Sequence, residues 1–140
     1  MQVPMKIENI LDNGEIVAII FYNRPIDPGV HFYTKNESTL QVGKQFRLKG
    51  EQIKPHQHLP VKMQKKETLQ EVLYIEKGRV KINFYNDHWE EIDSKILSQG
   101  DMILLIKGGH GFEMLEETVM IEVKQGPYNP AATVRREKSG

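Results

Sequence analysis

The sequence predicts an all-β fold, either a barrel or a jelly roll, and three observations lead to this prediction. Short apolar segments recur along the chain and are separated by turn-forming residues. Apolar residues almost nowhere repeat at helical spacing over two turns. About ten such segments at this spacing suit a closed or double-layered β architecture.

The first half of the chain begins with a predicted hairpin. Asn13-Gly14 supplies the positive φ angles that tight hairpin turns require. A loop with two prolines, Arg24–Gly29, then interrupts any pairing. The strands expected in this half are Met5–Leu11, Glu15–Tyr22, Val30–Thr34 and Ser38–Leu48.

The second half carries the clearest alternation. Val80, Ile82 and Phe84 alternate with polar or amphipathic neighbours, so one face of this strand should be buried. A turn at Lys77-Gly78 predicts that this strand forms a hairpin with the one before it. The expected strands are Glu71–Ile75, Arg79–Tyr85, His88–Leu97, Met102–Ile106, Gly111–Leu115 and Thr118–Lys124.

Length and composition favour one globular domain over residues 1–140. We expect an N-terminal hairpin and loop over 1–28, a barrel core over 29–126 and a C-terminal tail over 127–140. The chain has 19 basic and 19 acidic residues, which argues against nucleic acid as a partner. No apolar run is long enough for a membrane span or a signal peptide, so we expect a cytoplasmic protein without a membrane partner.

Three histidines stand out as candidate metal ligands. The chain has no cysteine, so its histidines and carboxylates must carry any metal chemistry. His56 and His58 are two residues apart, and on a strand their side chains would share one face, roughly 6.6 Å apart. His110 follows Gly108-Gly109, and imidazole suits zinc, iron, nickel and copper. His88 follows a turn and is interpreted as a surface histidine.

Glycines at set distances from these histidines complete a larger pattern. Gly50, five residues, His56-Gln57-His58, then Glu71, six residues and Gly78 form the first part; Gly100 and His110 form the second. This pattern resembles the two motifs of the cupin superfamily and extends over most of the chain. The resemblance implies a double-stranded β-helix, or jelly-roll, barrel with one divalent metal ion, Fe, Mn, Ni or Zn, bound by His56, His58, Glu71 and His110.

The chain departs from the family pattern at two places. Twelve residues, 59–70, separate His58 from Glu71 where the family has three or four, so Glu67 is a rival to Glu71 as the carboxylate ligand. Glu71 is preferred because it keeps the six-residue distance to Gly78. Ile106 stands where the second motif has proline, and the stretch to His110 is one residue shorter. The inserted lysines, Lys62, Lys65 and Lys66, are interpreted as a solvated face, with attraction of an anionic substrate as the alternative.

Three functions follow from the resemblance. The first is a metalloenzyme, such as a dioxygenase or isomerase, whose ion chelates a small polar metabolite. The second is a metal-free isomerase or epimerase of nucleotide-linked sugars, in which histidines act as acid and base within carbohydrate metabolism. The third is a non-catalytic module that binds a small molecule. A homodimer is the expected assembly.

Overall fold

The computed structural model describes residues 6–60, 69–126 and 138–139. They contain ten β-strands and no helix, which confirms the all-β prediction. Within these residues there is accordingly no helix that could cross a membrane. The strands are β1 (Ile7–Asp12), β2 (Glu15–Phe21), β3 (Gly29–Phe32), β4 (Gly43–Phe46), β5 (Glu71–Lys77), β6 (Arg79–Tyr85), β7 (Glu91–Ser98), β8 (Met102–Leu105), β9 (Gly109–Met114) and β10 (Val119–Lys124).

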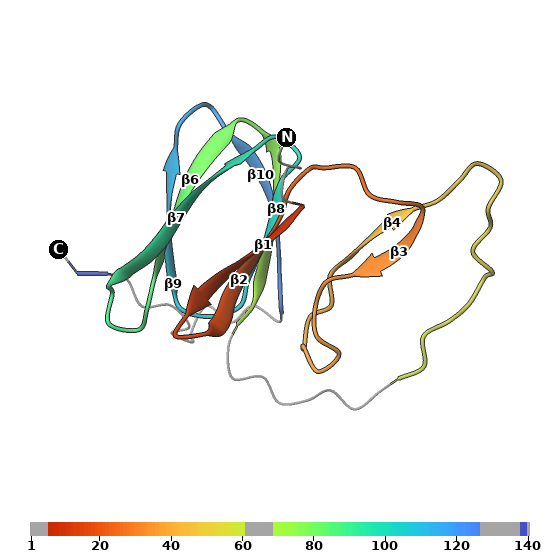
Figure 1. Ribbon diagram of the computed structural model, residues 1–140, viewed down its shortest axis with the longest axis horizontal. Helices are drawn as coiled ribbons and strands as arrows, with labels where there is room; N and C mark the ends of the chain where they lie inside the picture. Colours follow the sequence, from red (N-terminus) through yellow and green to blue (C-terminus); the bar gives the residue numbers. More distant parts are fainter. Residues whose placement is uncertain (1–5, 61–68, 127–137, 140) are drawn as a thin grey trace. The chain divides into compact units, whose positions relative to one another are not determined.

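The chain divides into two compact units. The larger unit combines Met1–Arg24 with Thr68–Gly140, and the smaller unit is Pro25–Glu67. The described strands form three separate antiparallel sheets and not one closed barrel (Figure 1). Five strands in the order β1-β2-β8-β5-β10 and three in the order β7-β6-β9 belong to the larger unit, and the pair β3-β4 belongs to the smaller one.

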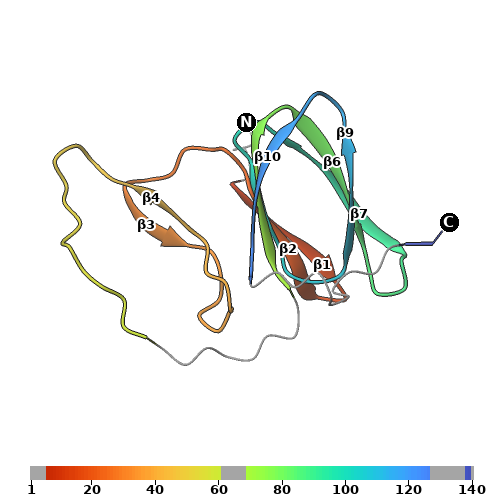
Figure 2. The ribbon, with the colours of Figure 1, turned by 180° about the vertical axis from the view of Figure 1, so that it is seen from behind.

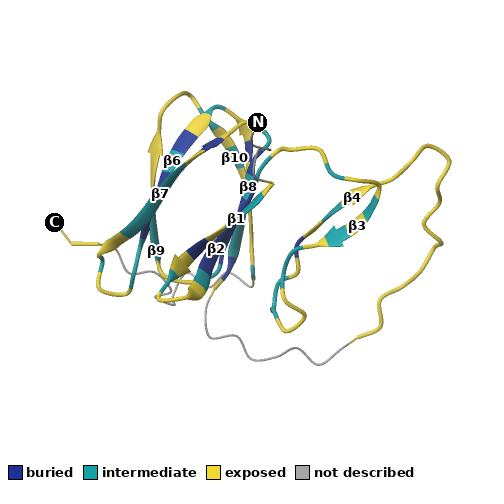
Figure 3. Cartoon of the chain, in the orientation of Figure 1, coloured by how far each residue is buried: buried dark blue, intermediate teal, exposed yellow. Residues whose placement is uncertain are grey.

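The hydrophobic core of the larger unit lies between its two sheets. Burial alternates along β6, where Val80, Ile82 and Phe84 are at most 2% exposed, as the sequence pattern predicts (Figure 3). These side chains pack against residues of the five-stranded sheet such as Ile75 and Ile103. The complete cluster is Ile10, Val17, Ala18, Ile20, Leu73, Ile75, Val80, Ile82, Phe84, Leu97, Ile103 and Leu105.

Of the two hairpins predicted around glycine turns, one is confirmed and one is wrong. β1 and β2 form the expected hairpin, and Asn13 and Gly14 both have positive φ angles, 49° and 81°. The hairpin predicted across Lys77-Gly78 is wrong, because β5 pairs with β8 and β10 whereas β6 pairs with β7 and β9. The turn at Gly78 instead passes the chain from one sheet to the other, which lets both strands direct apolar side chains into the same core.

The larger unit is tied together along one side, where β1 faces β7. The Lys95 ammonium on β7 lies 2.9 Å from Glu8 Oε2 on β1, and the Tyr22 hydroxyl donates to Glu8 Oε1 at 2.7 Å. Each of these residues is far from the others in sequence. This ion pair therefore links an edge of the five-stranded sheet to an edge of the three-stranded sheet.

The opposite side of the larger unit ends in two edge strands. Among the described residues, β9 pairs only with β6 and β10 only with β5 (Figure 2). Several of their apolar side chains are exposed: Phe112 by 36%, Met114 by 49% and Val123 by 57%. Among the described strands, none pairs with the outer edge of β9 or of β10.

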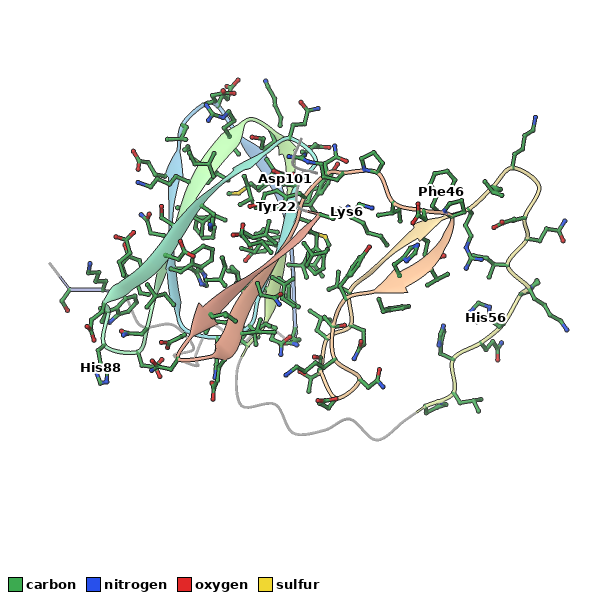
Figure 4. All side chains as sticks on the ribbon, in the orientation of Figure 1. Lys6, Tyr22, Phe46, His56, His88 and Asp101 are labelled. Carbon is green, nitrogen blue, oxygen red and sulfur yellow. The ribbon has the colours of Figure 1, made fainter. Side chains whose placement is uncertain are left out.

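A buried carboxylate organises the turn between β7 and β8. Asp101 is only 5% exposed, and its two oxygens accept hydrogen bonds from the backbone N–H groups of Asn23 and Ser98, both at 2.8 Å. Figure 4 shows Asp101 close to Tyr22, at the end of β2. The carboxylate thus joins the end of β2 to the β7–β8 turn.

Candidate metal centre

His56 and His58 lie in the segment after β4, in the smaller unit (Figure 4). The expectation that they occupy a strand or strand edge is wrong for this structure, since residues 47–60 contain no strand and both side chains are exposed. Pro55 explains this locally, because it has no N–H to donate to a β-ladder immediately before His56. The two imidazoles are nevertheless neighbours, with ring centroids 5.2 Å apart.

The hydrogen bond of His56 determines which ring nitrogen is available to a metal. Nδ1 of His56 lies 2.8 Å from the backbone carbonyl oxygen of Lys54. A carbonyl oxygen can only accept, so Nδ1 must carry the proton in this hydrogen bond. In the neutral ring the lone pair is then on Nε2. A backbone carbonyl that orients the other nitrogen in this way is the usual outer partner of a metal-binding histidine.

Glu71 begins β5 and faces the interior of the larger unit. In the sheet register it lies directly opposite Leu105 of β8, which belongs to the core, and it is two residues from buried Leu73 on the same strand. Directly opposed residues in antiparallel strands project to one face of the sheet. The carboxylate is therefore on the inward face, and Glu71 is only partly buried.

His110 is on the inward face of the other sheet. It lies opposite Phe84, whose side chain is 2% exposed in the core. The rings of His110 and Phe112, two residues apart on β9, have centroids 5.5 Å apart in an edge-on arrangement.

Topology brings Glu71 and His110 to the same end of the larger unit. Glu71 is the residue of β5 farthest from the Gly78 turn, and Phe84 lies near the corresponding far end of β6. Because His110 pairs with Phe84, it must also lie at the end remote from Gly78. We call this region, defined by Glu71, Leu105 and His110, the His110 end.

The four predicted ligands thus form two pairs in different units. Glu71 and His110 share the His110 end of the larger unit, and His56 and His58 are neighbours in the smaller unit. In the described part of the chain, no three or more histidine or acidic side chains are grouped closely enough to hold an ion. The donor set itself, three neutral imidazoles and one carboxylate, has the chemistry that divalent transition metals bind.

The rival carboxylate and the inserted lysines lie outside the described residues. Glu67, Lys62, Lys65 and Lys66 fall within residues 61–68. The choice between Glu67 and Glu71 stays a prediction.

The remaining two histidines have local roles. His88 is exposed in the turn before β7, as expected, and its backbone N–H donates to Asn86 Oδ1 at 2.9 Å. His31 on β3 is partly buried, and its Nε2 lies 2.9 Å from the carbonyl oxygen of Asp27.

Lys124 also lies at the His110 end, and the sequence pattern does not predict this. Lys124 is directly opposite Glu71 across the β5–β10 ladder, so it shares the inward face at the His110 end. Nothing in the local sequence indicates this, because alternation in β10 places apolar Ile121 and Val123 on the outer face. Only the register of β10 against β5 shows which face is inward.

Comparison of the chain with protein-family models found no match, and comparisons with curated proteins and with solved structures found none either.

Proposed function

We propose that this protein is a metal-binding cupin in which His56, His58, Glu71 and His110 hold one divalent ion that binds a small polar metabolite. The observation that carries the proposal is the placement of Glu71 and His110. Two residues 39 positions apart in sequence face inward at the same end of a two-sheet unit. β5 and β9 do not pair with each other, so no strand ladder requires these two residues to lie at the same end. Binding of one metal ion by both residues would require it.

The hydrogen bond of His56 gives independent support. Its Nδ1–H is held by the carbonyl of Lys54, which leaves Nε2 as the available donor in the neutral ring. His58 lies beside it, so two imidazole donors can approach one ion. Together with Glu71 and His110, they would leave coordination positions for water or substrate.

The proposal also includes the closed jelly-roll barrel. In a closed barrel the outer edges of β9 and β10, which pair with no strand among the described residues, would be joined to further strands. An isolated two-stranded sheet such as β3-β4 is also marginal in water.

When bound, such an ion would polarise a substrate carbonyl or activate dioxygen, and it would do so at neutral pH. The four ligand side chains would hold the ion in position. Glu71 supplies the single negative charge, so the complex with a divalent ion keeps a net positive charge that attracts an electron-rich ligand. Iron, manganese, nickel and zinc all suit this donor set.

The test is the number of metal ions bound per chain, measured by elemental analysis on protein without a histidine tag. We expect close to one ion per chain in the parent and a near-complete loss in His56→Ala/His58→Ala and in His110→Ala. His31→Ala/His88→Ala removes the same number of histidines and should keep the ion. Glu71→Gln should weaken metal binding by about tenfold or more, because a charged ligand is lost.

If the parent protein bound no metal after reconstitution with iron, manganese, nickel or zinc, the proposal would be contradicted. The metal-free alternative, in which histidines act as acid and base on a nucleotide-linked sugar, would then be the function to examine. Metal lost equally from the His31→Ala/His88→Ala control would contradict the assignment of the ligands.

A further inference from the structure

Two aromatic rings lie together on the outer face of the three-stranded sheet. Tyr85 is the last residue of β6 and follows buried Phe84, so its side chain projects away from the core. The ring centroids of Tyr85 and Trp89 are 5.9 Å apart, and the ring planes are inclined by 62°. We call these two residues the Tyr85–Trp89 pair.

The turn after β6 fixes the position of Trp89. Asn86 Oδ1 accepts hydrogen bonds from the backbone N–H groups of His88 and Glu90, at 2.9 and 3.0 Å. The N–H of Trp89 donates to the carbonyl oxygen of Asn86 at 3.1 Å. Trp89 has a φ of 63°, a left-handed conformation that a bulky residue keeps only where its surroundings impose it. The indole ring is therefore held in place before any ligand binds.

Two glycines of β9 leave space for these rings. Gly109 lies opposite Tyr85 in the β6–β9 ladder, and Gly111 is two residues farther along the same face. A Cβ atom at Gly109 would lie 2.7 Å from Cζ3 of Trp89, and one at Gly111 would lie 3.8 Å from Cε2 of Tyr85. The two rings thus occupy space that side chains at these positions would otherwise fill.

The surroundings of the two rings are acidic. Asp87 and Glu90 lie in the turn between β6 and β7, and Glu91 is directly opposite Tyr85 in the β6–β7 ladder. All three residues are exposed. The face of an aromatic ring attracts a cation, and nearby carboxylates add to that attraction. This part of the surface therefore favours a positively charged ligand.

The structure already has a cation on the Tyr85 ring. The ammonium of Lys138 lies 4.8 Å from the ring centre, well inside the separation at which a cation and a ring attract each other. Lys138 follows the last strand, β10, in sequence, so the chain brings an alkylammonium group of its own to the ring.

We propose that the Tyr85–Trp89 pair is a binding site for a small alkylammonium metabolite, and that Lys138 occupies it as a competing internal ligand. A free ligand must displace the Lys138 ammonium to reach the Tyr85 ring. The tail thereby raises the ligand concentration at which the site fills. The site uses none of the four proposed metal ligands, so it stands or falls independently of the proposed function.

The experiment is a titration of the full chain with choline at constant ionic strength. Trp89 is the only tryptophan of the chain, so its fluorescence reports on this site. Saturation transfer from the protein to the methyl protons of choline, measured by NMR, is the second readout. The control ligand is the neutral alcohol of the same shape in which carbon replaces the charged nitrogen. We expect it to bind at least about threefold more weakly than choline.

The role of the tail is tested by removing its charge. Lys138→Gln should raise the affinity for choline at least about twofold, because a site that the tail fills in most molecules is available to a free ligand only in the rest. Lys77→Gln is the matched control, since it also removes one positive charge but lies beside Gly78, at the other end of β6 from Tyr85. Its affinity for choline should equal that of the parent.

The role of the Tyr85 ring is tested by a second set of variants. Tyr85→Leu keeps an apolar side chain but removes the ring, and should weaken choline binding at least about threefold. Tyr85→Phe keeps the ring and should bind choline within about twofold of the parent. Tyr74→Leu removes a tyrosine that is 39% exposed on the five-stranded sheet and should leave choline binding unchanged.

The opposite results would overturn the proposal. If neither readout detected choline, or if the neutral alcohol bound equally well, the Tyr85–Trp89 pair would not be an ammonium site. Equal binding of choline by Tyr85→Leu and the parent would lead to the same conclusion. If Lys138→Gln bound choline like the parent, or Lys77→Gln gained as much affinity, Lys138 would not be an internal ligand.

Discussion

Glu8 is a partly buried carboxylate whose charge links the two sheets of the larger unit. Burial acts to raise its pKa, but the hydrogen bonds from Tyr22 and Lys95 and the charge of Lys95 outweigh burial, so the pKa of Glu8 is below its ordinary value of 4.5. The hydrogen bond to Glu8 also raises the pKa of Lys95, against the effect of burial. Burial and the hydrogen bond to Glu8 raise the pKa of Tyr22. All three groups therefore keep their native protonation states around neutral pH.

We expect Glu8→Gln to lower the free energy of unfolding at pH 7 by about 1–2 kcal/mol, measured by urea denaturation. A carboxylate with a lowered folded-state pKa contributes stability above its unfolded pKa and loses it as pH falls through the folded pKa. The difference between parent and variant should thus be constant from pH 6 to pH 8 and shrink below pH 4.5. A difference that persists unchanged at pH 3 would contradict this account of Glu8.

The turn at Gly78 connects β5 in the five-stranded sheet to β6 in the three-stranded sheet. Gly78 has a φ of 95°, and a Cβ atom at this position would lie 2.4 Å from the backbone oxygen of Glu117. Figure 1 shows this turn and the β9–β10 loop at the same end of the larger unit. Glycine is thus required here for two reasons, a left-handed backbone and a close approach of two chains.

We expect Gly78→Ala to lower the free energy of unfolding by about 2 kcal/mol or more, because both the positive φ angle and the contact with Glu117 oppose a methyl group. Gly14→Ala is the matched control, since Gly14 has a φ of 81° but no heavy atom within 4 Å of the added Cβ. It should cost only about 1 kcal/mol, the penalty of the left-handed backbone. Equal losses in the two variants would show that the close approach to Glu117 contributes nothing.

The five-stranded sheet has an apolar outer surface over β5 and β10. Tyr74, Ile121 and Val123 are 39%, 48% and 57% exposed, and the pairing of Tyr74 with Ile121 places them on the face opposite the core. A contiguous exposed apolar patch is typical of a protein interface. The homodimer expected from the sequence stays a prediction, and this patch is the surface through which we now expect it to form.

We expect light scattering to give twice the mass of one chain for the parent, and Ile121→Lys to weaken association at least about tenfold by placing a charge in the apolar contact. Ile96→Lys is the control, because Ile96 is similarly exposed, by 45%, on the three-stranded sheet. A parent that is monomeric at high concentration, or a variant that dimerises like the parent, would rule out this interface.

The path of the C-terminal tail is known at one point. Of the predicted tail, 127–140, only residues 138–139 are described. The ammonium of Lys138 lies 4.8 Å from the centre of the Tyr85 ring, so this part of the tail contacts β6.

Local patterns in the sequence were sufficient to locate the strands of the larger unit and the β1–β2 hairpin. Alternation in β6 predicts its buried face because side chains in a strand project alternately to the two sides of the sheet. Asn13-Gly14 predicts its turn because few residues tolerate positive φ angles. The resemblance to the cupin motifs predicts four ligands, of which Glu71 and His110 are on inward faces at one end of the larger unit.

Strand partners and the inward face of β10 were decided only by the tertiary structure. The Lys77-Gly78 turn is compatible with a hairpin, yet β5 and β6 enter opposite sheets, and both direct apolar side chains into one core. The Glu8–Lys95 ion pair and the position of Lys124 opposite Glu71 likewise depend on register between distant strands. Such pairings are set by burial summed over the whole core, and no short stretch of sequence carries that information.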